Sequence, residues 1–226
     1  MPLYKSTKIV LSVSNNPTGF LSGIASNTLD QPRGAFLDLH GKIIATFDQV
    51  RVDDNRYLLV LEEKFFDALM GHLERYIKLS KAVVKREVYQ VYFDLAGDYQ
   101  CGEDEFFIAQ RQGQLVLTQN NLKSGVSAEE FTLFRLKNNI PIQGVDYNNE
   151  FLLNIDETEF VSYTKGCFLG QEPVAKVHNR SKPSWKLAVK PENECSIEEK
   201  QKMTSKAHDP ITGKTLGFVF MSTVLT

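Results

Sequence analysis

The pattern of apolar and polar positions in the first third of the chain predicts an antiparallel sheet followed by a helix. Three runs rich in β-branched and aromatic residues are separated by turns at residues 40–41 and 53–55, an arrangement typical of a meander. These strand-like runs cover residues 35–39, 42–52 and 56–61. Apolar residues then recur every three or four positions from Phe65 to Ile77, which predicts an amphipathic helix over one face of the sheet.

The middle of the chain continues the mixture of strands and helices. The patterns at residues 88–95, 106–110 and 115–118 predict strands, and turn residues separate them. Ser127 followed by Glu130 is the signature of a capping box, so a helix should begin there and end before the proline at position 141. Strands and helices mixed in this order favour an α+β fold built from packed layers.

The character of the chain changes near residue 180. Short strands are predicted at residues 185–189 and 215–220, and the stretch between them is polar and charged. We interpret residues 1–180 as the main α+β domain. Residues 181–226 are expected to form a small β domain that is too short for a large core of its own.

Composition and charge narrow the classes of function. The 226 residues carry a formal net charge of −2 and are 42% hydrophobic, which favours a globular core and argues against a nucleic-acid partner. No apolar run approaches the ~20 residues that a membrane-spanning helix needs. The first residues also lack the apolar core of a signal peptide. We therefore expect a cytoplasmic protein without a membrane partner.

The three cysteines, Cys101, Cys167 and Cys195, are widely spaced and form no Cys-x-x-Cys pair, so we expect free thiols and no metal site made by this chain alone. An iron–sulphur cluster usually takes four cysteinates, so any cluster here would need ligands from another chain or from small thiols. The chain also lacks the glycine-rich phosphate loop, the dinucleotide-binding fingerprint and the serine elbow of hydrolases.

The most informative segment is Lys165-Gly166-Cys167-Phe168-Leu169-Gly170-Gln171-Glu172. Two glycines beside a thiol suggest an unusual backbone path around Cys167, and the positive charge of Lys165 would favour the reactive thiolate. The plainer interpretation is a buried structural thiol, because free cysteine is among the most buried residue types. His178 is the candidate base for a nucleophilic pair with Cys167. The basic stretch at residues 176–186 is either a solvated loop or an anion site, for example for the glutamate tail of a folate.

This octet resembles the signature of the YgfZ-like proteins, Lys-Gly-Cys-Tyr/Phe-x-Gly-Gln-Glu, at all seven specified positions. These proteins are folate-binding relatives of the glycine-cleavage T-protein that serve iron–sulphur cluster assembly or repair. The likeness extends over most of the chain, through residues 19–30, 35–45, 135–141 and 209–217. It implies a T-protein-type main domain with ferredoxin-like character and a short C-terminal β-barrel-like domain.

The resemblance also implies roles for individual residues. Cys167 would be the functional thiol, and the motif around it comprises Lys165, Gly166, Phe168, Gly170, Gln171 and Glu172. Arg135 and Thr28 would contact a folate, so that tetrahydrofolate is the implied cofactor. The implied partners are iron–sulphur proteins or their assembly factors.

Two departures from the T-protein pattern bear on the reaction. Ala45 and Thr46 stand where that family has an aspartate pair, and neither can act as a carboxylate base, which argues against aminomethyl transfer. Lys137 stands where the T-protein presents a glutamate to the pterin ring, and Asn139 replaces a glycine of the same segment, which weakens the case for folate. Three functions stay open: a thiol-dependent accessory factor for iron–sulphur clusters, a folate-dependent one-carbon transferase, and a non-catalytic interaction module.

Overall fold

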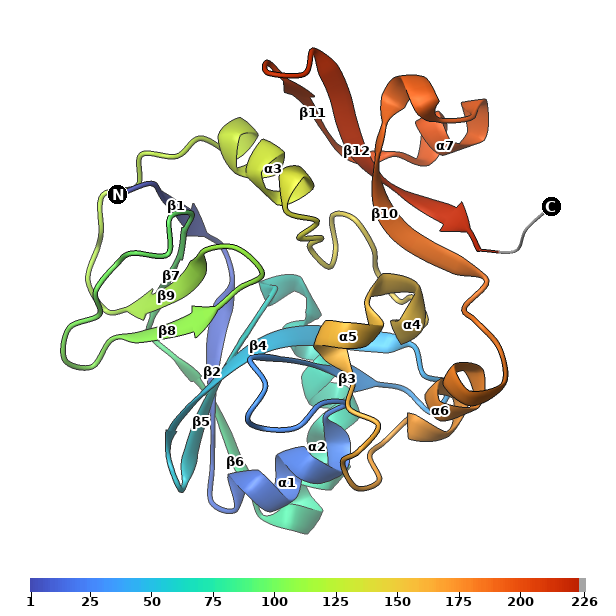
Figure 1. Ribbon diagram of the computed structural model, residues 1–226. Helices are drawn as coiled ribbons and strands as arrows, with labels where there is room; N and C mark the ends of the chain where they lie inside the picture. The colour runs from blue at the N-terminus through green and yellow to red at the C-terminus, as the bar shows by residue number, and fades with distance from the viewer. Residues whose placement is uncertain (224–226) are drawn as a thin grey trace.

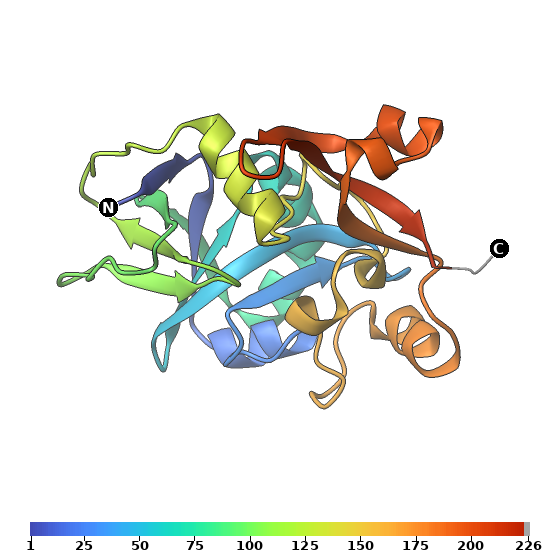
Figure 2. The ribbon, with the colours of Figure 1, turned by 45° about the horizontal axis from the view of Figure 1, so that its top comes forward.

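The computed structural model describes residues 1–223, which form three antiparallel sheets surrounded by helices (Figures 1 and 2). The expected mixture of α and β structure is therefore confirmed. The five-stranded sheet has the order β3 (Arg33–Leu37), β4 (Ile43–Asp53), β5 (Arg56–Leu61), β2 (Ile9–Ser14), β6 (Val83–Glu87). The four-stranded sheet has the order β1 (Leu3–Ser6), β7 (Gln90–Asp94), β9 (Gln114–Thr118), β8 (Phe106–Ala109). The C-terminal sheet has the order β10 (Trp185–Pro191), β12 (Lys214–Ser222), β11 (Thr204–Asp209).

The five-stranded sheet is buried on both faces. One face packs against α1 (Pro17–Ile24) and α2 (Phe66–Ser80), which follows a 3-10 turn, η1 (Glu63–Phe65). Leu69 and Leu73 lie one turn apart on α2 and are both buried against this face, as the spacing predicts. The other face packs against the four-stranded sheet, where Val10 and Leu58 meet residues such as Phe93. The predicted meander is confirmed, because β3, β4 and β5 are consecutive antiparallel neighbours.

Helix α3 (Ala128–Lys137) begins and ends as predicted. The hydroxyl of Ser127 accepts a hydrogen bond from the amide of Glu130, and the Glu130 carboxylate accepts one from the amide of Ser127. The helix ends before the Ile140-Pro141 segment. It lies between the four-stranded sheet and the C-terminal sheet, so it joins the two parts of the molecule (Figure 1).

The C-terminal part contains more structure than the sequence pattern predicts. The charged stretch between the two expected strands holds η2 (Glu192–Glu194), α7 (Ile197–Lys202) and β11. In residues 181–223 both β10 and β11 pair with β12 alone, so the sheet is open and the expected barrel-like closure is absent from this part. Leu187 and Phe218 of this sheet share a hydrophobic cluster with Leu136 of α3. The small sheet therefore packs against α3.

Three short helices follow α3 and precede β10 in the sequence: α4 (Leu152–Ile155), α5 (Glu157–Phe160) and α6 (Gln171–Arg180). Helix α6 includes residues 176–180, so the prediction that the basic stretch is wholly a loop is wrong. Its pattern is hard to recognise because Val174 is the one fully buried residue among ten. Among residues 1–223, no helix combines the length and apolar character needed to cross a bilayer.

Candidate functional site

The octet forms the loop after α5 and the first residues of α6, and it exposes the thiol of Cys167. The next side chain, Phe168, is buried in the cluster beneath α6. The amide of Leu169 donates to the carbonyl oxygen of Gly23 in α1 at 3.1 Å. The loop is therefore fixed directly after an exposed cysteine, and the interpretation of Cys167 as a buried structural thiol is wrong.

The two glycines of the octet differ in what the backbone requires of them. Gly170 is the N-cap of α6 with a φ of +81°, a left-handed conformation that glycine adopts at little cost. A Cβ atom there would lie 2.4 Å from the carbonyl oxygen of Asp38 and 2.8 Å from the Cβ of Leu37. A Cβ atom at Gly166 would meet no atom within 4 Å, so the fold does not require glycine at that position.

Lys165 ties the octet to the end of α1. Its Nζ donates to the backbone oxygen of Ala25 at 2.5 Å and to that of Asn27 at 3.1 Å, and it lies 5.1 Å from the centre of the Phe168 ring. The carbonyl groups at the end of a helix attract a cation. Burial nevertheless lowers the pKa of Lys165 to about 8. The expected effect of Lys165 on the Cys167 thiolate stays a prediction.

Cys167 opens onto a groove of about 1140 Å³. Six segments line it: α1, the α1–β3 loop with Thr28, the β4 segment with Arg51, the β5 segment with Tyr57, the β8 segment with Phe107, and the octet. The structure thus brings Thr28 and Cys167 together, although they are far apart in the sequence. The groove exceeds the 300–1,000 Å³ typical of small-molecule pockets.

The other two thiols are less accessible. Burial raises the pKa of both Cys101 and Cys195, and the Cys195 thiol also donates to the carbonyl oxygen of Pro191 at 3.3 Å. Among residues 1–223, no group of three or more potential metal ligands is close enough to hold an ion. Of the three thiols, Cys167 is the one that is exposed.

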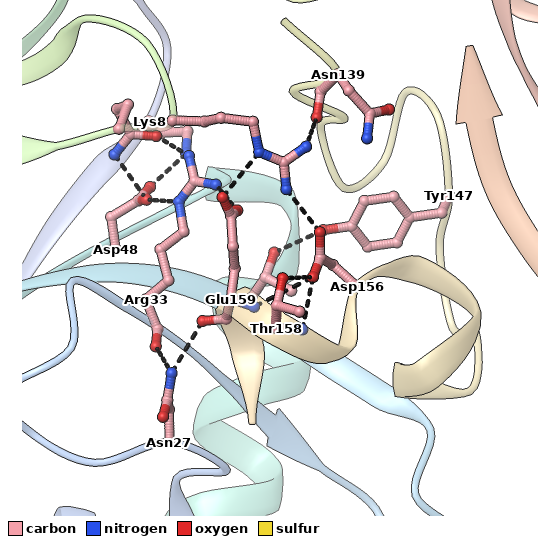
Figure 3. Close-up of polar contacts among 12 residues, drawn as sticks. Lys8, Asn27, Arg33, Asp48, Asn139, Tyr147, Asp156, Thr158 and Glu159 are labelled. Atoms are coloured by element: carbon pink, nitrogen blue, oxygen red, sulfur yellow. Dashed lines mark hydrogen bonds and ion pairs between the residues drawn. The ribbon is translucent and has the colours of Figure 1, made fainter. Parts of the chain in front are cut away.

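A second polar site is a chain of ion pairs that links Lys8, Asp48, Arg33 and Glu159 (Figure 3). Asp48 accepts from Nζ of Lys8 at 2.9 Å and from Nε of Arg33 at 3.1 Å. Arg33 also contacts Glu159, which in turn accepts from Nε of Arg111 at 2.9 Å. Burial alone would raise the pKa of Asp48, but the charges of Lys8 and Arg33 hold that pKa below its usual value.

Asn27 connects this ion-pair chain to the groove. Its side-chain amide donates to the backbone oxygens of Arg33 and Glu159, both at 2.9 Å (Figure 3). Its own backbone oxygen accepts the hydrogen bond from Lys165. Asn27 therefore holds both the octet, through Lys165, and the ion-pair chain, through Arg33 and Glu159.

The ion pairs leave a central cavity of only about 60 Å³. Thr46 lines this cavity and its hydroxyl lies 3.2 Å from Oε1 of Gln143 and 3.1 Å from the hydroxyl of Tyr147, while Ala45 is buried in the core. Neither position offers a carboxylate to the cavity. Since small-molecule sites usually measure ~300 Å³ or more, this cavity has room for water but not for a folate.

Arg135 lies at the central cavity rather than at the groove. Its Nη1 pairs with Asp146 at 2.8 Å, and its Nη2 donates to Ser205 of β11 at 2.8 Å. Lys137, on the same helix, pairs with Asp209 at 2.8 Å. Both residues therefore join α3 to the C-terminal sheet. Arg135 and Thr28 were expected to contact one folate, but they line different cavities.

The remaining site predictions concern α6. Gln171 and Glu172 form its first turn, where the negative charge of Glu172 interacts favourably with the helix dipole. His178 lies in the last turn and stacks on Tyr163, with ring centroids 3.7 Å apart. The residues that sequence reasoning missed are Arg51 and Phe107, which reach the groove from separate sheets and carry no local motif.

No protein-family model matches the chain. A Haemophilus influenzae protein described as uncharacterized is 23% identical over 203 residues, which cover 84% of this chain and 72% of that protein. The crystal structure of glycine cleavage system aminomethyltransferase T from Bartonella henselae matches 97% of this chain and 78% of that chain, with a TM-score of 0.74 and 14% identity. The chain therefore has the fold of a glycine-cleavage T-protein.

Proposed function

We propose that this protein is an accessory factor in the assembly or repair of iron–sulphur proteins and that Cys167 is its functional thiol. The observation that carries the proposal is the exposure of this thiol on a large groove. The thiol belongs to an eight-residue segment that fits the YgfZ-like pattern at every specified position. A buried phenylalanine and a helix cap hold the segment in place, which is what a thiol presented to a partner requires.

The cluster would be cargo rather than a resident cofactor. Because one thiol cannot hold a cluster, the other ligands would come from the client or the donor protein. In the simplest exchange, Cys167 gives its proton to solvent and its sulphur forms one bond to iron. One thiolate of the donor leaves that iron and takes up a proton, so no oxidant or reductant is required.

Folate has a weaker structural case. The central cavity is filled by paired side chains and does not fit a folate, while the groove is large enough but lacks Arg135. A folate-dependent one-carbon transferase would also need an acid–base group at positions 45 and 46, which alanine and threonine do not provide. We therefore assign folate no part in the thiol chemistry.

Complementation in cells that lack this protein tests the function. We expect Cys167→Ala to restore little of the activity of cluster-containing enzymes, although enzymes without clusters stay unaffected. Cys101→Ala is the matched control, because it removes a partly buried thiol outside the groove. Immunoblots would verify equal protein levels. Wild-type restoration by Cys167→Ala would refute the thiol role.

A turnover assay separates the proposal from the transferase. Purified protein is incubated with a methylated amine and tetrahydrofolate, and transfer of the one-carbon unit to the folate is measured. We expect no turnover. Formation of methyltetrahydrofolate together with the demethylated amine, abolished by Thr46→Val, would instead support one-carbon transfer at the central cavity.

A further inference from the structure

The four-stranded sheet ends in β8, and the free edge of this strand faces the groove. Among residues 1–223, β8 pairs with β9 alone, through the register Phe106↔Leu117 to Ala109↔Gln114. The β8 residues Phe107, Ile108 and Ala109 all line the groove. An unpaired strand edge beside a groove is a template for another strand.

The hydrogen-bond pattern shows which backbone groups of β8 are free. The amide of Gln110 donates to the oxygen of Gly113 at 3.1 Å, just beyond the last strand pair. Bonded and non-bonded pairs alternate along an antiparallel ladder, so Phe107 and Ala109 are the non-bonded residues. Their N–H and C=O groups point away from β9. Within the described residues, neither amide donates to any other group.

The side chains of β8 alternate in the same way. Ile108 is buried against the five-stranded sheet, whereas Phe107 has 57% of its surface exposed and Ala109 is also exposed. A large exposed aromatic ring next to free backbone groups provides an apolar contact for the side chains of an added strand. Edge strands are usually blunted by charge or proline, and β8 carries neither.

We propose that an extended peptide segment of a client protein binds in this groove as an added strand along β8, with one of its cysteines facing Cys167. Donors and acceptors of Phe107 and Ala109 recur about 7 Å apart, which matches alternate residues of a strand. The groove volume of about 1140 Å³ also exceeds what a small metabolite fills. Strand addition of this kind draws affinity from the main chain, and side-chain pockets provide selectivity.

The inference depends on the proposed function for the meaning of Cys167, but not for the binding of a strand. The lining of the groove has mixed charge, because it includes the cations Arg51 and Lys165 and the carboxylate of Asp30. Such a lining favours neither a strongly acidic nor a strongly basic segment. The expected client segment is therefore extended, close to neutral and cysteine-containing.

Disulfide capture of a synthetic peptide tests this inference. The probe is a peptide of about nine residues that alternates threonine and valine around a central cysteine, long enough to span β8. The cysteine carries a 2-thiopyridine disulfide, so attack by Cys167 forms a mixed disulfide and releases 2-thiopyridone. The matched control has the same side chains but alternate N-methylated amides, which block strand pairing along one edge.

With a competing small thiol present, we expect capture of the unmodified peptide to exceed that of the N-methylated peptide about tenfold, one step of ~1.4 kcal/mol. Amide exchange in the captured complex should slow at Phe107 and Ala109. The amide of Ile108, already bonded to β9, should change little. Ala109→Pro removes the outward N–H donor of residue 109, which makes no hydrogen bond to β9. This variant should therefore weaken capture of the peptide.

Equal capture of both peptides, with no slowing of exchange at Phe107 and Ala109, would overturn the inference. The N-methylated control keeps this test valid even if Ala109→Pro does not fold. The outcome is also separable from the proposed function. If Cys167→Ala fails to restore cluster enzymes but no strand adds to β8, the function stands and the binding mode fails. If the peptide protects the β8 amides from exchange but Cys167→Ala restores cluster-enzyme activity fully, the binding mode stands and the proposed function fails.

Discussion

Replacing Gly170 by alanine tests whether the backbone turn before α6 holds the thiol loop in place. The φ of +81° would cost a residue with a Cβ about 1–2 kcal/mol. The new Cβ would lie 2.4 Å from the carbonyl oxygen of Asp38, so β3 and α6 would have to separate. Overpacking of this kind costs about 1–3 kcal/mol. We therefore expect Gly170→Ala to lower the free energy of unfolding by about 2–5 kcal/mol.

This decrease in the free energy of unfolding can be measured as a lower Tm by circular dichroism or calorimetry. For a chain of this size each 1 kcal/mol shifts Tm by ~2–4 °C, so a decrease of about 4–20 °C is expected. Gly166→Ala is the matched control, because an added Cβ meets no atom within 4 Å and φ there is not positive. It should change stability by less than about 1 kcal/mol, with slight stabilisation. Equal Tm values for the two variants would refute the reasoning.

Four further predictions concern the ion-pair chain and the thiol loop. Asp48→Ala leaves the buried Arg33 and the half-buried Lys8 without this partner and should cost about 3–5 kcal/mol in urea unfolding at pH 7. The pKa of Asp48 is lower in the folded state than in the unfolded state. Its contribution to the free energy of unfolding is therefore fully present above pH ~4 and lost as pH falls through the folded pKa. Asp48→Asn should flatten the acid side of the plot of stability against pH. N-ethylmaleimide should modify Cys167 before the other two thiols, as measured by peptide mass spectrometry. Lys165 releases its proton near pH 8 in the folded state and later in the unfolded state, so stability should rise with pH above 8 in the wild type and less in Lys165→Met.

The elements that could be predicted from the sequence are those fixed by local physics. The β3–β5 meander has turn residues between β-branched runs, α2 has a clear apolar stripe, and α3 carries its own capping box. Helix α6 lacks such a pattern, since Val174 is its one buried residue, and its N-cap Gly170 packs so closely against Leu37 and Asp38 that a Cβ would clash. Strand β11 lies in a charged stretch and is stabilised by pairing with β12. Neither contact is local, so neither could be predicted from residue spacing.

The same limit applies to the candidate site. The octet identified Cys167 and Lys165, and the structure places both at one groove with Thr28. Sequence alone could not show that Phe107 from another sheet completes that groove. It also could not show that Arg135 lies away from this groove. The guanidinium of Arg135 is paired with Asp146 at the interface with the C-terminal sheet. Long-range topology decides which distant residues share a cavity, and a single sequence does not reveal it.

The energetics of the centre explain why the groove is the better candidate for function. A ligand in the central cavity would have to separate Arg33 from Asp48, whose side chains are 9% and 6% exposed. Breaking a buried pair costs about 3–5 kcal/mol, which weakens binding by roughly two to four orders of magnitude. The groove carries no such cost, because its thiol, its exposed ring and the free edge of β8 are already accessible to solvent. The T-protein fold thus keeps its shape here, while the accessible chemistry lies on the surface formed by the octet and β8.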